Sequence, residues 1–122
     1  HLIHPLGFQI NDKNLRRAGM DYWDSLNVIE YKDWDTFLAS DKRPQRIHLF
    51  TTHASKTLWE TKFQEADGLL FGNEGSGAPP EVHQWAQDNR ITIPKYKDGL
   101  MSLNLAVSVG IATYEAIRQI SI

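Results

Sequence analysis

Short apolar strands that alternate with amphipathic helices predict an α/β fold, with a mostly parallel sheet flanked by helices. Three segments carry this prediction: the apolar stretch Arg46 to Thr52, the run Gly68 to Phe71 that leads into a glycine-rich turn, and a C-terminal helix with one apolar stripe. The chain has 122 residues, enough for one modest core, so we expect residues 1–122 to form a single domain.

The elements of the first forty residues alternate in this way. We expect a strand over residues 1–4, a helix over residues 12–18 ended by Gly19, a strand over residues 26–31, and a helix from Asp33 to about Ser40. In the last of these, Trp34, Phe37 and Leu38 share one face.

The remaining elements continue the alternation. We expect strands over residues 46–52, 68–71 and 91–93, a helix through Gln87 with Pro79 at its first or second position, and a long final helix from Ser102 to Ile120. Residues 53–66 have no clear pattern. In the final helix, the apolar stripe consists of Leu103, Val107, Gly110, Ile111, Tyr114 and Ile117.

Composition excludes several classes of protein. The chain has no cysteine, which excludes disulfides, thiolate catalysis and cysteine–zinc sites and is compatible with a reducing cytoplasm. No apolar run approaches the roughly 18 residues of a membrane span. The net charge of −2 argues against coating of nucleic acid by bulk charge, but allows a local basic patch. The five histidines share no ligand spacing beyond His1 and His4, so we predict no metal site.

The glycine-rich turn after residue 71 is a candidate binding loop. Its spacing, with glycines at 72, 75 and 77, fits neither the P-loop nor the GxGxxG pattern. It is therefore either a tight strand-to-helix turn or a loop whose bare backbone can approach an adenine or a ribose. Glu74 within it either orients the loop or meets substrate.

Two further groups of polar residues are candidates. Ser102 is either a helix cap or a site residue, and Asn104 is poorly explained by helix propensity alone. Lys13, Arg16 and Arg17 are neighbours on a short helix, where they form either a solvated face or a patch that contacts RNA phosphates.

With these motifs placed, the chain resembles the SpoU branch of the SPOUT RNA methyltransferases. Three ordered blocks carry the resemblance: Leu70-Phe71-Gly72-Asn73-Glu74-Gly75-Ser76-Gly77, then Ile93-Pro94 with Ser102-Leu103-Asn104-Leu105, and Tyr114-Glu115-Ala116-Ile117-Arg118-Gln119. Pro5-Leu6-Gly7-Phe8 and Leu15-Arg16-Arg17-Ala18-Gly19-Met20-Asp21-Tyr22 look more narrowly like the TrmL (YibK-type) group, which methylates the ribose 2′-hydroxyl of the tRNA wobble nucleotide.

The resemblance implies a fold, a cofactor and partners. The family fold has a deep C-terminal trefoil knot, in which S-adenosylmethionine is held mainly by backbone groups of three loops. At the matching positions these loops would supply cofactor-binding residues, namely Phe50, Thr51, Gly72, Glu74, Gly77, Ile93, Ser102 and Leu103. Ser102 and Asn104 would serve at the catalytic centre, and Lys13, Arg16 and Arg17 would contact tRNA. A cytoplasmic homodimer with the last helix in its interface is implied.

Some family features are not matched. The family's first strand and first motif, which carries the arginine assigned to catalysis, fall before His1, so we expect that an N-terminal piece is missing from this chain. Asn73 stands where the TrmL group has proline, and His53 stands where a basic residue follows Thr-Thr. Two other interpretations remain open: a non-catalytic RNA-binding or dimerisation module of the same fold, and a generic nucleotide-binding domain.

Overall fold

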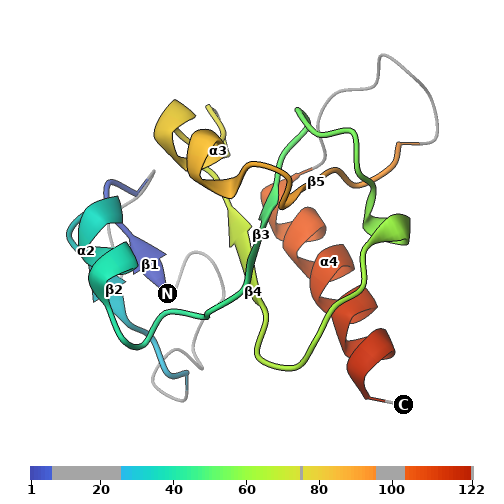
Figure 1. Cartoon of the computed structure of the whole chain (residues 1–122), viewed down its shortest axis with the longest axis horizontal. Coiled ribbons are helices and arrows are strands. Elements are labelled where there is room, and N and C mark those ends of the chain that lie inside the picture. The colour runs from blue at the N-terminus through green and yellow to red at the C-terminus, as the bar shows by residue number, and fades with distance from the viewer. Residues whose placement is uncertain (7–25, 75, 96–103, 122) are drawn as a thin grey trace. The chain divides into compact units, whose positions relative to one another are not determined.

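The computed structural model describes residues 1–6, 26–74, 76–95 and 104–121. The chain divides into two compact units, His1–Arg43 and Pro44–Ile122, which are considered separately below (Figure 1). The predicted helix over residues 12–18, with Lys13, Arg16, Arg17 and Gly19, lies outside the described residues.

The first unit pairs two short parallel strands. Strand β1 (Leu2–Ile3) lies beside β2 (Glu30–Tyr31), and the backbone N–H of Leu2 donates to the carbonyl of Ile29 at 2.8 Å. Both strands are shorter than predicted. The pairing covers only two residues of each strand. Leu26, which we expected to begin the second strand, is 45% exposed.

Helix α2 (Trp34–Ala39) follows as predicted, because its cap and its apolar face are both encoded locally. Asp33 is the N-cap, and its Oδ1 accepts from the Thr36 backbone N–H at 2.8 Å. Trp34 and Phe37 are buried, and the Phe37 ring meets the Tyr31 ring edge-on at 5.2 Å.

The second unit is built on a three-stranded parallel sheet in the order β4-β3-β5. The central strand β3 (Ile47–Phe50) is buried along its whole length, with β4 (Gly68–Phe71) on one side and β5 (Arg90–Ile91) on the other. The bounds of β4 are those predicted, whereas β3 and β5 are shorter. A parallel sheet flanked by helices confirms the predicted α/β class.

In the part of this unit that the structure describes, three helical segments accompany the sheet. Helix α3 (Pro80–Ala86) packs against β3, and α4 (Leu105–Ile120) packs against β4 and runs beside the strands in Figure 1. The prediction for Pro79 was wrong: its backbone is extended at ψ 155°, so Pro79 is the N-cap and Pro80 is the first helical residue. A short 3₁₀ turn, η2 (Leu58–Glu60), lies in the stretch left unassigned.

The core of this unit joins the sheet to η2 and α4. Its buried members are Phe50, Leu58, Phe63, Ile91 and Ala112. Ala112 is fully buried, whereas the predicted apolar stripe of α4 faces away from this core: Val107, Ile111, Tyr114 and Ile117 are 50%, 37%, 73% and 40% exposed.

Two predictions about the fold are not tested by these residues. The trefoil knot depends on the loop after β5, of which residues 96–103 lie outside the described part, and the single-domain assignment also stays a prediction. Among the described helices, none is both long and apolar enough to cross a membrane.

Candidate functional site

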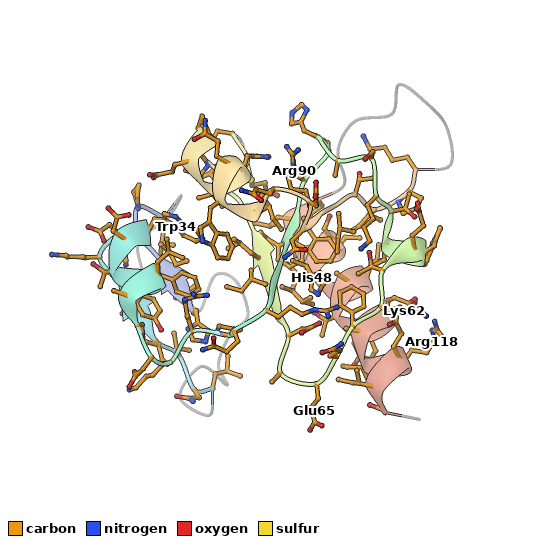
Figure 2. The ribbon with its side chains drawn as sticks, viewed as in Figure 1. Trp34, His48, Lys62, Glu65, Arg90 and Arg118 are labelled. Atoms are coloured by element: carbon orange, nitrogen blue, oxygen red, sulfur yellow. The ribbon has the colours of Figure 1, made fainter. Side chains whose placement is uncertain are left out.

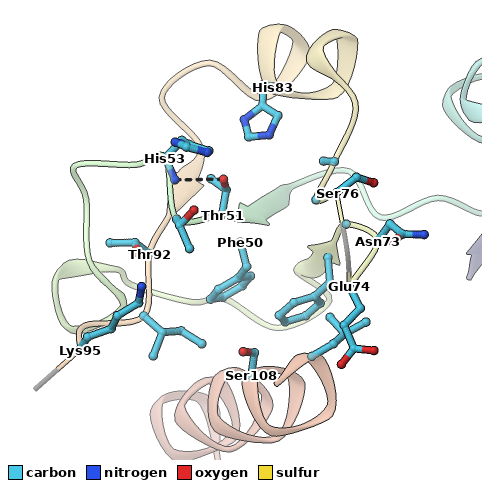
Figure 3. A pocket seen from close by; sticks show the side chains of 17 residues that line it. Phe50, Thr51, His53, Asn73, Glu74, Ser76, His83, Thr92, Lys95 and Ser108 are labelled. Carbon is cyan, nitrogen blue, oxygen red and sulfur yellow. Dashed lines mark hydrogen bonds between the residues drawn. The ribbon is translucent and has the colours of Figure 1, made fainter. Parts of the chain in front are cut away.

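A cavity of about 300 Å³ lies at the carboxyl ends of the three strands of the second unit. Open parallel sheets bind ligands in this position, because the loops that follow the strands converge there. Residues 50–53, 71–74, 76–78 and 92–93 line the cavity, together with His83, Lys95, Leu105 and Ser108 (Figure 3).

The cavity gathers residues that the sequence had picked out from three separate segments. The described residues predicted to bind cofactor all line it, namely Phe50, Thr51, Gly72, Glu74, Gly77 and Ile93. Asn104 adjoins it through a hydrogen bond to Glu74. Ser102 and Leu103 lie outside the described residues, as do Lys13, Arg16 and Arg17.

Two stacked aromatic rings form an apolar wall of the cavity. The rings of Phe50, at the end of β3, and Phe71, at the end of β4, are 4.8 Å apart and inclined by 10°. The two strands pair in parallel with these residues directly in register, which brings the rings together. Ile93 from the third loop also packs here. Such a wall suits a flat heteroaromatic ligand.

The glycine-rich loop closes on itself. The Asn73 and Gly77 backbones exchange hydrogen bonds of 2.8 and 3.2 Å. A Cβ on Gly72 would overlap the backbone of Gly77 and Ala78, and Gly77 has φ +72° in the left-handed region. Of the two interpretations of this stretch, a tight turn and a loop whose bare backbone approaches a ligand, the contact at 72 fits the tight turn, because the close neighbour there is the loop's own chain.

Glu74 and Asn104 link the loop to α4. The Asn104 Nδ2 donates to Glu74 Oε1 at 3.3 Å, while its Oδ1 accepts from the Val107 backbone N–H at 3.2 Å. Asn104 is therefore the N-cap of α4, the position for which we had predicted Ser102. An asparagine inside the first turn would be disfavoured, but one at the cap is among the preferred residues.

Two histidines line the cavity that the sequence did not indicate as ligand-binding residues. His53 follows β3 and His83 comes from α3, and their ring centroids are 6.3 Å apart. Their common location depends on how the β3 loop meets α3, which no local pattern encodes. The described residues contain no group of three or more histidine, cysteine, aspartate or glutamate side chains that could hold a metal ion.

A buried polar cluster lies outside the cavity lining. His48 on β3 is 3% exposed, and its Nε2 lies 2.9 Å from Asp67 Oδ2, which also accepts from the Gln64 backbone N–H (Figure 2). Arg46 Nε lies 3.3 Å from the same oxygen. Burial lowers the pKa of His48 below its usual value, although the hydrogen bond that Asp67 accepts from the ring acts in the opposite direction.

Comparisons with known proteins agree with one another. The model of the SpoU rRNA Methylase family matches residues 1–114. A Burkholderia pseudomallei protein described as tRNA (cytidine(34)-2′-O)-methyltransferase is 39% identical over 98% of this chain and 77% of its own length, and an Escherichia coli protein of the same description is 36% identical over 98% and 76%.

The fold of the chain is also similar to that of a solved structure. It is described as "Structural insights into the 2-OH methylation of C/U34 on tRNA" and superposes with a TM-score of 0.85 at 42% sequence identity. The match covers 98% of this chain and 76% of that chain.

Proposed function

The chain belongs to the SpoU rRNA methylase family, and we propose that it is a tRNA methyltransferase that modifies the ribose 2′-hydroxyl of nucleotide 34, the wobble position. The observation that carries the proposal is the match to proteins described by that activity over 98% of the chain. The cavity at the strand ends supplies a place for the chemistry.

We propose S-adenosylmethionine as the methyl donor. When bound, it supplies a methyl group already activated by a sulfonium. The donor set of the cavity fits it: stacked Phe50 and Phe71 offer an apolar surface for an adenine, and the loop from Gly72 to Gly77 offers main-chain groups. Thr51 and Ile93 complete this set, and the resemblance adds Ser102 and Leu103.

We propose that Asn104 is a positioning residue of the site. Its side chain holds the start of α4 and the Glu74 carboxylate together, so it orders the loop against the helix. We propose the same ordering role for Ser102 next to it in sequence. Such positioning contributes to rate because the reacting oxygen and methyl carbon must be held in line.

We further propose that the protein acts as a homodimer in the cytoplasm, where its tRNA substrate is found. The support is the α4 stripe of Val107, Ile111, Tyr114 and Ile117, which this chain leaves exposed. A second copy of the same helix would bury it. Lys13, Arg16 and Arg17 stay our candidates for contact with the RNA backbone.

Calorimetric titration with S-adenosylmethionine tests the cofactor part of this function. We expect saturable binding to the unmodified protein and a clear loss of affinity in Gly72→Val, whose side chain cannot fit within the closed loop. Gln84→Asn, on the exposed side of α3, serves as the control and should bind normally. The absence of heat with the unmodified protein, together with no shift in its melting temperature, would contradict the proposal.

A further inference from the structure

The rim of the cavity carries two imidazoles, those of His53 and His83, whose ring nitrogens have no partner among the residues that the structure describes. Figure 3 shows His53 and His83 together on the side of the cavity away from Glu74 and Ser108. The ring planes are inclined by 64°. Within the described residues, neither ring takes part in a hydrogen bond or an ion pair, and the bond from His53 to Thr51 Oγ1 comes from its backbone N–H.

Two rings that converge from separate elements provide paired N–H donors for one anionic group. His53 is exposed and His83 is half-buried, so a macromolecule can reach both. Glu74, the carboxylate among the described lining residues, lies away from them in Figure 3. Lys95 also lines the cavity, but it already takes part in another interaction.

The chemistry of the proposed substrate supplies such an anion. In RNA, the 2′-hydroxyl and the 3′-phosphate sit on adjacent carbons of one ribose. A site that receives the 2′-oxygen therefore also brings that phosphate close to its rim. Phosphate contacts from protein donors fix the register of a nucleic acid, because every nucleotide offers the same group.

On the premise of the function proposed above, we propose that His53 and His83 together bind the phosphate on the 3′ side of the target nucleotide. The pair positions the RNA, and it takes no part in holding the cofactor.

The first test compares RNA and cofactor affinities. An anticodon stem-loop RNA is titrated by fluorescence anisotropy against the unmodified protein, His53→Gln, His83→Gln and the double variant. We expect each single change to weaken RNA binding about three- to tenfold, which lies within the range for the net contribution of one typical hydrogen bond. Calorimetry should give unchanged S-adenosylmethionine affinity, and melting curves should show folded variants. Gln84→Asn, on the exposed side of α3 and outside the cavity lining, should bind RNA normally.

The second test asks whether the phosphate itself is recognised. Two stem-loops, both with 2′-deoxyribose at the target nucleotide, differ only in an uncharged methylphosphonate on its 3′ side. The unmodified protein should bind the methylphosphonate RNA more weakly, while the double variant should not distinguish the two RNAs.

Several results would overturn the assignment. These are an unchanged RNA affinity in the double variant, an equal penalty from the methylphosphonate in both proteins, a parallel loss of cofactor affinity, or a loss seen in Lys95→Gln and in neither histidine variant. Because binding is the readout, a protein that shows the expected pattern but transfers no methyl group would support the pair and contradict the proposed function.

Discussion

Gly72 and Gly77 meet two different physical needs in one loop. At 72 the backbone of Gly77 and Ala78 occupies the space of a side chain, whereas at 77 the space is open and the φ of +72° is the constraint. The sequence left two interpretations open here, a tight strand-to-helix turn and a loop whose bare backbone approaches a ligand. It could not separate steric need from conformational need, because that depends on how the loop closes.

Alanine at each glycine should therefore act differently. Gly77→Ala should lower the free energy of unfolding by about 1–2 kcal/mol through its left-handed backbone and leave cofactor affinity nearly intact. Gly72→Ala should reduce cofactor affinity strongly, because the loop must open. Thermal melting and calorimetry measure the two effects. Native cofactor affinity in Gly72→Ala would show that the loop does not shape the site.

The buried His48 predicts a dependence of stability on pH. Its pKa is lowered in the folded chain by burial, so between its ordinary value and that lower value the unfolded chain binds more protons. Stability should hold above about pH 6.5 and fall as the pH drops below it. In urea titrations between pH 7 and pH 5, His48→Gln should flatten this decline. His4→Gln is the matched control at a partly exposed histidine paired with Glu30, and an equal decline in unmodified protein and His48→Gln would exclude His48 as the cause.

At the scale of elements, the sequence predicted those helices and strands whose caps and apolar faces are encoded by neighbouring residues. The Asp33 cap and the apolar face of α2, and the bounds of β4, are confirmed because a few neighbouring residues encode them. The η2 turn was missed although Thr57 and Glu60 form a capping box, a pattern that is visible in sequence. The start of α4 was misassigned by two residues, since Ser102 and Asn104 are both good caps and tertiary contact with Glu74 favours the latter.

Two substitutions at Asn104 separate its role as the N-cap of α4 from its hydrogen bond to Glu74. Asn104→Ala should cost about 1 kcal/mol of stability, with a range of 0.5–2, by removing the cap. Asn104→Asp retains a cap acceptor but puts a carboxylate against Glu74. It should keep most of the stability and lose cofactor affinity. Chemical denaturation and calorimetry report the two quantities, and equal behaviour of the two variants would contradict the double role.

At the scale of the molecule, the sequence predicted the α/β class and the segments that line the cavity. It predicted less well how these segments come together in space. Three loops were chosen by motif and resemblance, and the order β4-β3-β5 brings them together. The meeting of His53 with His83 had no sequence signal, since it depends on packing between distant segments. The exposed stripe on α4 was foreseen as apolar, but only the fold shows that it faces away from the core.

That stripe predicts the oligomeric state. Ile111→Glu and Tyr114→Arg should convert a dimer to a monomer in analytical ultracentrifugation, because a charge in a buried apolar interface is strongly unfavourable. Gln84→Glu adds a charge on α3 and should leave the dimer intact. A monomeric unmodified protein would refute the assembly.

Transfer of a labelled methyl group from S-adenosylmethionine to tRNA is the most direct test of the proposed activity. The tRNA is then digested and the labelled nucleotide is located. We expect label at nucleotide 34, in a dinucleotide that resists alkaline hydrolysis because its 2′-oxygen is methylated. Label on a base, label at another nucleotide, or no label in tRNA would contradict the assignment.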